Sequence, residues 1–180
     1  IQAFADDLIS LAEGSDLSII RHRTIKTLTH INNWCKEQGL KLSALKTTMI
    51  MFTKKPYWKM KPISIEGNII QPSKTAKYLG VTLDERLNFK EHIRNIVNRA
   101  KSNIIRTTMA VGPTWGLTPR TALWLYRQTV RPIITYASPI WIRATQNKHN
   151  ATKLRSVQSL ALRIATGAFP KTAGADLNMI

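Results

Sequence analysis

The stretch QAFADDL, residues 2–8, places two adjacent aspartates between two short apolar runs. Short β-prone runs on either side of a polar pair are typical of a β-hairpin. We therefore expect strand, tight turn and strand over residues 1–13. Asp6 and Asp7 are then expected at the tip of that hairpin.

Two adjacent carboxylates repel each other, and a divalent cation removes that repulsion. Hard carboxylate oxygens suit Mg²⁺, which usually takes one or two carboxylates together with substrate phosphates. Two such ions about 4 Å apart can activate a 3′-hydroxyl and neutralise a leaving pyrophosphate. Because aspartate is also common in ordinary turns, Asp6 and Asp7 alone leave two interpretations open, a metal site and a simple turn.

Beyond the hairpin, helical and strand patterns alternate. The 3- and 4-residue spacing of apolar side chains predicts a helix over residues 17–35, capped by Ser15 or Asp16 and stopped at Gly39. Strands are expected at residues 47–53, at residues 63–70 as a hairpin, and at residues 77–83 with a glycine in the middle. The fold class expected for this part is α+β.

After residue 86, apolar side chains recur only at helical spacing. Helices are expected around residues 89–104, 119–130 and 154–164. Pro119 suits the first position of a helix, and Pro132 should interrupt the helix that it follows. We therefore divide the chain into a mixed part, residues 1–86, and a helical part, residues 87–180.

The charge is strongly positive and unevenly distributed. The chain has 27 Lys and Arg against 10 Asp and Glu, a net charge of +17, and between His92 and Ala175 there are 13 cations and no acid. Nucleic acid is the usual partner of such a surface, because phosphate contacts release counterions; an acidic protein region is the alternative. The single cysteine, Cys35, excludes a disulfide framework. The longest uncharged stretch has 13 residues, which is too short to span a membrane, so no membrane partner is expected.

Further motifs follow residues 2–8 in order along the chain. They are GLKLSALKT at residues 39–47, YLGVTLD at 78–84, LY at 125–126, YASPIW at 136–141 and LRIATGA at 162–168. Together they resemble the reverse transcriptases of non-LTR (LINE-type) retrotransposons over nearly the whole chain. The resemblance implies a partial polymerase palm (β-hairpin, helix and antiparallel strands) in residues 1–86, followed by a basic, all-α, thumb-like region in residues 87–180.

The resemblance also implies roles for residues near the first turn. Asp6 and Asp7 would be catalytic and would bind Mg²⁺, for which Mn²⁺ can substitute. Phe4 and Ala5 would shape the floor beneath the primer end. Lys46 occupies the place of a lysine that protonates the leaving pyrophosphate, and its alternative is an ordinary solvated lysine.

A second set of residues would contact primer and template. For Gly80, which is expected inside a strand, a β-bulge is the alternative to close approach at a primer grip. The aromatic side chains between the cations either stack on bases or belong to the core, and Trp115 is the best stacking candidate. The nucleic-acid-binding residues expected are Leu79, Gly80, Arg94, Lys101, Arg106, Trp115 and Arg127.

The activity that the resemblance implies is RNA-directed DNA synthesis, in which dNTPs extend a DNA primer on an RNA template. Such polymerases take a third carboxylate from an earlier palm strand, so we expect a fragment of a longer chain that is inactive alone and works with the remainder of that chain. The implied compartment is the nucleus, with the cytoplasm as the alternative. Two rival hypotheses are a non-catalytic nucleic-acid-binding remnant of such an element and a domain that docks on an acidic protein.

Overall fold

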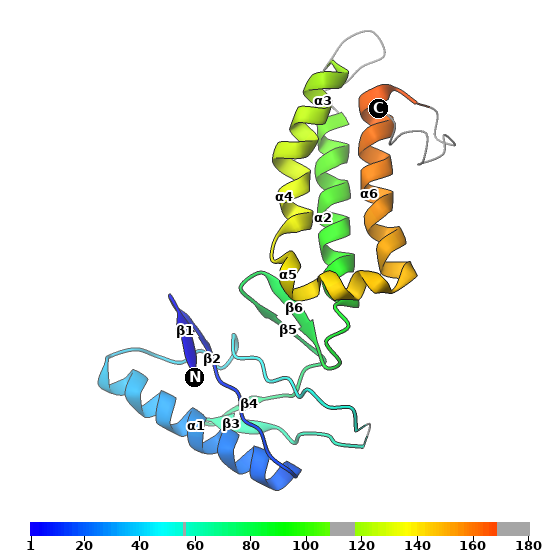
Figure 1. Cartoon of the computed structure of the whole chain (residues 1–180). Helices are drawn as coiled ribbons and strands as arrows, with labels where there is room; N and C mark the ends of the chain where they lie inside the picture. The colour runs from blue at the N-terminus through cyan, green and yellow to red at the C-terminus, as the bar shows by residue number, and fades with distance from the viewer. Residues whose placement is uncertain (56, 109–117, 169–180) are drawn as a thin grey trace. The chain divides into compact units, whose positions relative to one another are not determined.

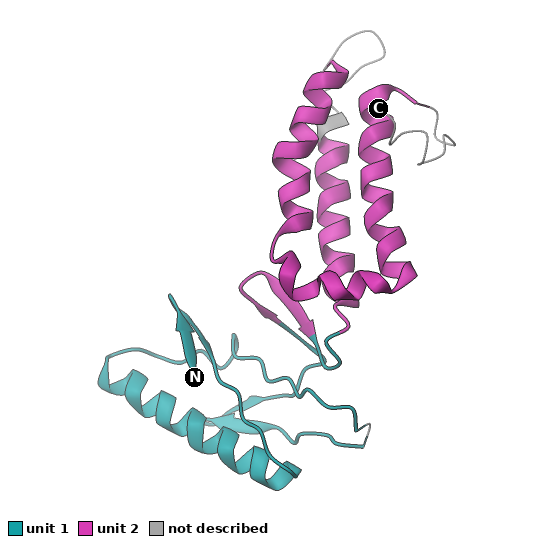
Figure 2. Ribbon diagram, in the orientation of Figure 1, with its two compact units in different colours: residues 1–76, 84–87 teal, residues 77–83, 88–180 magenta. Residues whose placement is uncertain are grey.

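The computed structural model describes residues 1–55, 57–108 and 118–168 (Figure 1). It divides into two compact units, coloured separately in Figure 2. Unit 1 comprises residues 1–76 and 84–87, and unit 2 comprises residues 77–83 and 88–180. Helices combined with small antiparallel strand pairs confirm the α+β class.

Unit 1 begins with the expected hairpin. Strand β1 (Gln2–Phe4) pairs antiparallel with β2 (Asp7–Ile9), with Phe4 opposite Asp7. Helix α1 (Leu17–Glu37) follows and is capped by Asp16, whose carboxylate accepts hydrogen bonds from the backbone N–H groups of Ser18 at 2.8 Å and Ile19 at 3.0 Å. The Ser18 hydroxyl also donates to this carboxylate, and this bond, followed by those from the backbone N–H groups, lowers the pKa of Asp16.

Helix α1 packs on a second hairpin, β3 (Ile63–Ile65) and β4 (Asn68–Ile70), joined by a two-residue turn. Ile31 and Cys35 on the helix are buried, as are Ile63, Ile65 and Ile70 on the strands. Polar contacts cross the same interface: Asn32 donates to the Glu66 carboxylate at 3.1 Å, and the Lys36 ammonium lies 2.5 Å from it. The hairpin and the helix expected from the sequence therefore form one small packed layer.

The strand expected at residues 47–53 was wrong. The segment makes a single β-bridge, between Met49 and Pro72, and the Ser73 N–H donates to the Met49 carbonyl at 2.8 Å. Pro72 has no N–H, so the ladder cannot continue past it. The β-prone side chains of this segment are present, but its backbone pairing is limited to this one bridge.

The single strand expected at residues 77–83 was also wrong. Residues 75–84 form a hairpin of β5 (Thr75–Tyr78) and β6 (Val81–Asp84), with Leu79 and Gly80 as its turn. Both turn residues have positive φ, 44° and 79°, as a type I′ hairpin turn requires. Gly80 is therefore neither a bulge nor a mid-strand residue.

Unit 2 is built mainly from helices. They are α2 (Lys90–Thr108), α3 (Pro119–Leu125), the π-helical turn η1 (Tyr126–Val130), α4 (Arg131–Thr135), α5 (Ser138–Trp141), the 3₁₀ turn η2 (Ile142–Gln146) and α6 (Lys148–Thr166). Of these, α2 and α3 begin close to the expected residues, whereas α6 begins six residues before the helix expected around 154–164, and α5 and η2 were not expected. Thr118 caps α3 by accepting from the Thr121 N–H at 3.2 Å, and Gly167 at φ 66° ends α6. Pro132 interrupts the regular helix as expected, because the π-helical turn lies directly before it.

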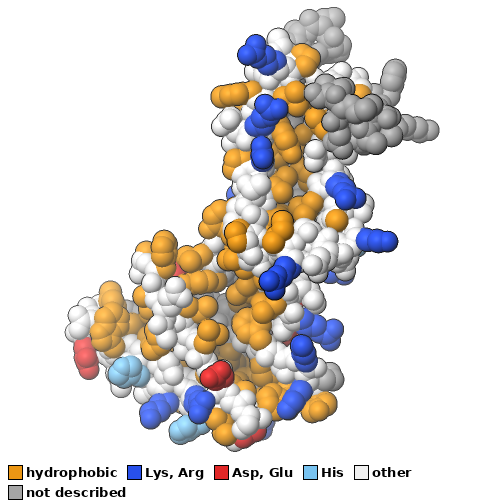
Figure 3. Space-filling model, in the orientation of Figure 1, with side chains coloured by type: hydrophobic (Ala, Val, Ile, Leu, Met, Phe, Trp, Pro, Cys, Tyr) orange, Lys and Arg blue, Asp and Glu red, His pale blue; other side chains and the backbone are white. Residues whose placement is uncertain are grey.

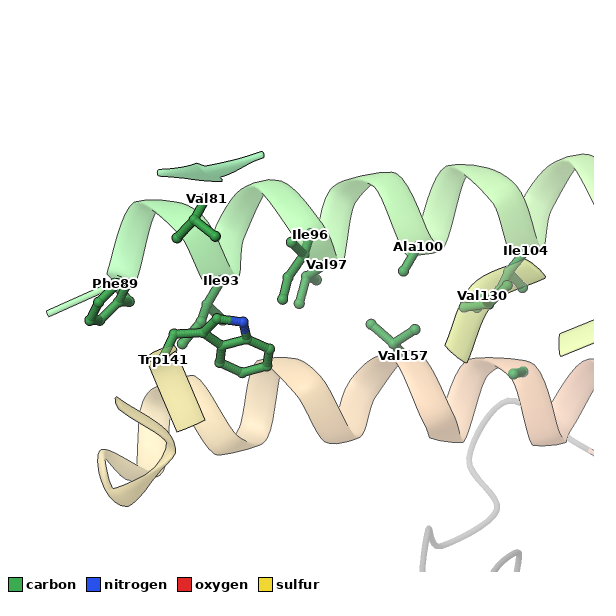
Figure 4. Close-up of a cluster of buried hydrophobic side chains, with 11 residues drawn as sticks. Val81, Phe89, Ile93, Ile96, Val97, Ala100, Ile104, Val130, Trp141 and Val157 are labelled. Atoms are coloured by element: carbon green, nitrogen blue, oxygen red, sulfur yellow. The ribbon is translucent and has the colours of Figure 1, made fainter. Parts of the chain in front are cut away.

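The core of unit 2 lies mainly between α2 and α6. Figure 4 shows side chains of α2 pointing toward α6, with Val97 and Ala100 nearest Val157 and the Trp141 indole beside Ile93. Val81 of β6 belongs to the same cluster. This packing places residues 77–83 with the helices.

Candidate active site and nucleic-acid surface

The aspartate pair lies on the two-residue turn of the β1–β2 hairpin. Ala5 and Asp6 form the turn, with Ala5 at φ 52°, and Asp7 is the first residue of β2. Both carboxylates are exposed, and the neighbouring Phe4 side chain is 62% exposed. The turn therefore presents two adjacent carboxylates and one aromatic side chain to solvent.

This donor set fits part of a magnesium site. Mg²⁺ usually takes one or two carboxylates from a protein when substrate phosphates supply other ligands, and Asp6 and Asp7 are consecutive residues that could provide them. Within the described ranges, no three or more His, Cys, Asp or Glu side chains gather as a metal-binding group. Among the described residues, Asp6 and Asp7 therefore have no third carboxylate, histidine or cysteine grouped with them as a further metal ligand.

Lys46 lies on a different turn of unit 1. Its backbone N–H donates to the Ser43 carbonyl at 3.2 Å, and its side chain is exposed. The structure thus places it on the surface of the unit that carries the aspartates, and its catalytic role stays a prediction.

The turn of the β5–β6 hairpin is fixed by a tyrosine from unit 2. The Tyr136 hydroxyl donates to the Leu79 carbonyl at 2.9 Å. A Cβ on Gly80 would lie 3.1 Å from Cε1 of the Tyr136 ring, which is tighter than ordinary van der Waals contact. Both turn residues named from the sequence are therefore held by a residue that the sequence interpretation treated only as a stacking or core aromatic.

His92 contacts the second strand of the same hairpin. The imidazole is 2% exposed, its Nδ1 accepts from the Thr82 N–H at 3.2 Å, and its ring centroid lies 5.7 Å from that of Trp141. The bond to Thr82 requires an unprotonated Nδ1, so the neutral ring carries its proton on Nε2. Burial lowers the pKa of His92 below its usual 6.5.

This depressed pKa predicts that unit 2 loses stability in mild acid. The unfolded chain binds a proton at His92 that the folded chain rejects, so the free energy of unfolding should fall as pH decreases below about 6.5. Protonation would also put a hydrogen on Nδ1, against the Thr82 donor. Thermal unfolding between pH 7 and pH 5 measures the effect: the dependence should weaken in His92→Gln and persist in His149→Gln, whose histidine is exposed on α6. Equal pH dependence in both variants would contradict this assignment.

The cations expected to bind nucleic acid lie on the helices of unit 2. Arg94, Lys101 and Arg106 are on α2, and Arg127 is on the π-helical turn. Arg94, Arg106 and Arg127 are all exposed. Arg94 is paired with Glu91 one turn earlier, so part of its charge is already neutralised. Blue side chains are spaced along these helices on the face that Figure 3 shows. Trp115 lies outside the described residues.

Three curated proteins of mobile elements match most of this chain. A probable RNA-directed DNA polymerase from transposon BS of Drosophila melanogaster is 29% identical over 92% of the chain. The Pol polyprotein from the type-1 retrotransposable element R1 of Nasonia vitripennis is 27% identical over 90%, and the RNA-directed DNA polymerase from mobile element jockey of Drosophila melanogaster is 24% identical over 93%. The chain spans 18%, 50% and 18% of these relatives.

These relatives are RNA-directed DNA polymerases and a Pol polyprotein of mobile elements, and the chain is similar to them over most of its length. More narrowly, the resemblance to non-LTR retrotransposon reverse transcriptases is confirmed. No protein-family model matches the chain. No solved structure matches it either.

None of the helices within the described ranges is long and apolar enough to span a membrane.

Proposed function

We propose that this chain is the part of a non-LTR retrotransposon RNA-directed DNA polymerase that carries the catalytic aspartate pair and a basic helical unit, the polymerase palm and thumb. The observation that carries the proposal is the exposed Asp6–Asp7 pair on a tight hairpin turn, in a chain whose relatives are such polymerases. The substrates would be an RNA template, a DNA primer and dNTPs. The nucleus, where a genomic primer is available, is the compartment we propose, with the cytoplasm as the alternative.

Asp6 and Asp7 would hold Mg²⁺ or Mn²⁺ through their carboxylates. When bound, a pair of such ions activates the primer 3′-hydroxyl and neutralises the charge of the leaving pyrophosphate. Phe4 and Ala5 would support the primer end beside the aspartates. Lys46 would supply a proton to the leaving group, which requires that it reach the site when template and primer are bound.

The remainder of the polymerase would complete the site. We expect a third carboxylate from a strand outside this chain, so the 180 residues alone should not incorporate dNTPs. Primer extension by the longer polymerase, with Asp6 replaced, is the direct test.

The helical unit would follow the phosphates of the template–primer duplex. Its cations lie on α2, η1 and α6, and an A-form duplex is recognised largely through its backbone. Contacts of this kind strengthen binding without reading the sequence of the bases.

Removing one exposed cation should lower the salt dependence of this binding. For Arg127→Ala, the slope of log affinity for an RNA–DNA duplex against log salt should fall in magnitude by about 1. Lys26→Ala is the matched control, because Lys26 is an exposed cation on α1 of unit 1. Fluorescence anisotropy at several salt concentrations measures both slopes, and an unchanged slope for Arg127→Ala would remove that residue from the interface.

The second candidate is a non-catalytic nucleic-acid-binding remnant of such an element. It is favoured by the placement of the α2 and α6 cations in a unit separate from the aspartates. The two candidates differ in one respect: only the polymerase requires Asp6.

A further inference from the structure

The turn of the β5–β6 hairpin is held by Tyr136 through two independent contacts. One is the hydrogen bond from the Tyr136 hydroxyl to the Leu79 carbonyl, 2.9 Å long. The other is the approach of the ring to Gly80, where the position of an added Cβ lies 3.1 Å from Cε1. All three residues lie in unit 2, so this contact belongs to one compact body.

Tyr136 is itself anchored to the core of unit 2. Its carbonyl accepts a hydrogen bond from the Trp141 Nε1–H at 3.0 Å, and the Trp141 side chain is only 2% exposed. Ala137, in the left-handed region at φ 50°, connects α4 to α5 directly after Tyr136. The path from the buried indole to the hairpin turn is thus continuous: Trp141, Tyr136, Leu79.

Yet the Tyr136 side chain is not buried. It is 55% exposed, so the bond to Leu79 contributes little to the hydrophobic core. What it fixes is the orientation of one peptide group at the tip of a two-residue turn, whose residues have positive φ values of 44° and 79°. Leu79 is not a glycine, so its backbone is strained at positive φ. Such a strained conformation persists only while neighbouring contacts hold it in place.

We propose that Tyr136 is a positioning residue that holds the Leu79–Gly80 turn in the conformation in which it contacts the primer strand. This rests on the proposed function, together with the contact to the primer that the family resemblance implies for Leu79 and Gly80. The helical unit, through Tyr136, then determines where the primer contact sits, and the hairpin acts as an extension of that unit.

The test compares the 180-residue chain with Tyr136→Phe, which removes the hydroxyl and keeps the ring. Affinity is measured for an RNA–DNA duplex with a recessed DNA 3′-end and for single-stranded RNA of the same length. Losing one hydrogen bond of ordinary strength should weaken binding of the primed duplex about three- to tenfold, with binding of single-stranded RNA unchanged. Tyr57→Phe, which alters a 75% exposed tyrosine of unit 1, is the matched control and should change neither affinity.

A second variant tests the ring contact. Gly80→Ala adds a Cβ against the Tyr136 ring. It should also weaken binding of the primed duplex, and leave binding of single-stranded RNA unchanged. Gly67→Ala is its control, because Gly67 has nearly the same φ, 78°, and nothing within 4 Å of its Cβ position, so it carries the backbone strain without the clash.

A spectroscopic measurement reports on the hydrogen bond between Tyr136 and Leu79 directly. The Leu79 carbonyl and the Gly80 N–H belong to one peptide group, so the Gly80 amide resonance in a ¹⁵N-correlation spectrum should shift in Tyr136→Phe and stay in place in Tyr57→Phe. A structural role alone would leave the ratio of primed to single-stranded affinity unchanged.

The outcomes separate the two proposals. If the wild-type chain does not bind the primed duplex, the proposed function fails, and the role of the turn fails with it. If the wild-type chain binds and Tyr136→Phe binds both nucleic acids equally well, only the positioning role of Tyr136 is overturned. An unshifted Gly80 resonance in Tyr136→Phe overturns that role as well.

Discussion

Asp6→Asn, in a polymerase that contains this segment and the palm before it, is expected to lower primer extension about a thousandfold or more. A carboxylate that holds a catalytic metal supports several kcal/mol of transition-state stabilisation, and about 4 kcal/mol corresponds to that factor. The substitution keeps the size of the side chain and removes its charge. It should leave the β1–β2 hairpin intact, because the Asp6 side chain is exposed. Primer extension on an RNA template, with Mg²⁺ varied, is the measurement.

Glu13→Gln is the matched control, since it removes one exposed carboxylate seven positions further along the chain and should leave extension within about twofold of wild type. Extension by Asp6→Asn close to wild type would contradict the metal role and favour the remnant interpretation. Incorporation of dNTPs by the 180 residues alone, abolished by Asp6→Asn, would show that the third carboxylate is not needed.

Trp141→Ala is expected to destabilise unit 2 by about 3–5 kcal/mol, because it removes a large side chain that is 2% exposed and leaves a cavity beside Ile93. It also removes the donor to the Tyr136 carbonyl and the ring that lies against His92. Urea unfolding followed by far-UV circular dichroism measures the loss.

Trp124→Ala is the matched control for that substitution. Trp124 is a tryptophan of α3 in the same unit, but it is 58% exposed, so the expected loss is about 1 kcal/mol or less. Equal destabilisation by the two substitutions would contradict the assignment of Trp141 to the buried core of unit 2.

Local signals predicted the elements that short-range chemistry determines. Asp16 before an apolar periodic run and Gly39 after it predicted α1, because a cap acceptor and a left-handed stop act within one helical turn. Thr118 followed by proline predicted the start of α3 in the same way. The aspartate turn was predicted because its flanking strands are adjacent in the sequence.

The elements that were missed depend on partners distant in the chain. Residues 47–53 have β-prone side chains, but their backbone pairs only at a single bridge with Pro72, which lies more than 20 residues further along the chain and lacks an N–H. Residues 77–83 read as one strand because a glycine is compatible with a bulge, a mid-strand site or a turn. The residue that holds the turn, Tyr136, lies 57 positions beyond Leu79. No pattern within one sequence indicates that two such distant residues are in contact. The chemistry of Asp6, Asp7 and Lys46 came from the resemblance, and the fold shows only where they lie.

The order in which α2 and α6 leave the ribosome has a consequence for the newborn chain. The apolar face of α2, including Ile93, Val97 and Ala100, is covered by Val157 and Ala161 of α6, which are synthesised about 60 residues later. At ordinary elongation rates of about 5–20 residues per second, several seconds pass before that cover exists. During this interval the apolar face of a basic helix lacks the cover that α6 supplies, and the contact of Tyr136 with Leu79 can form only after residue 136 has been synthesised. We infer that the helical unit completes itself only near the end of its own synthesis.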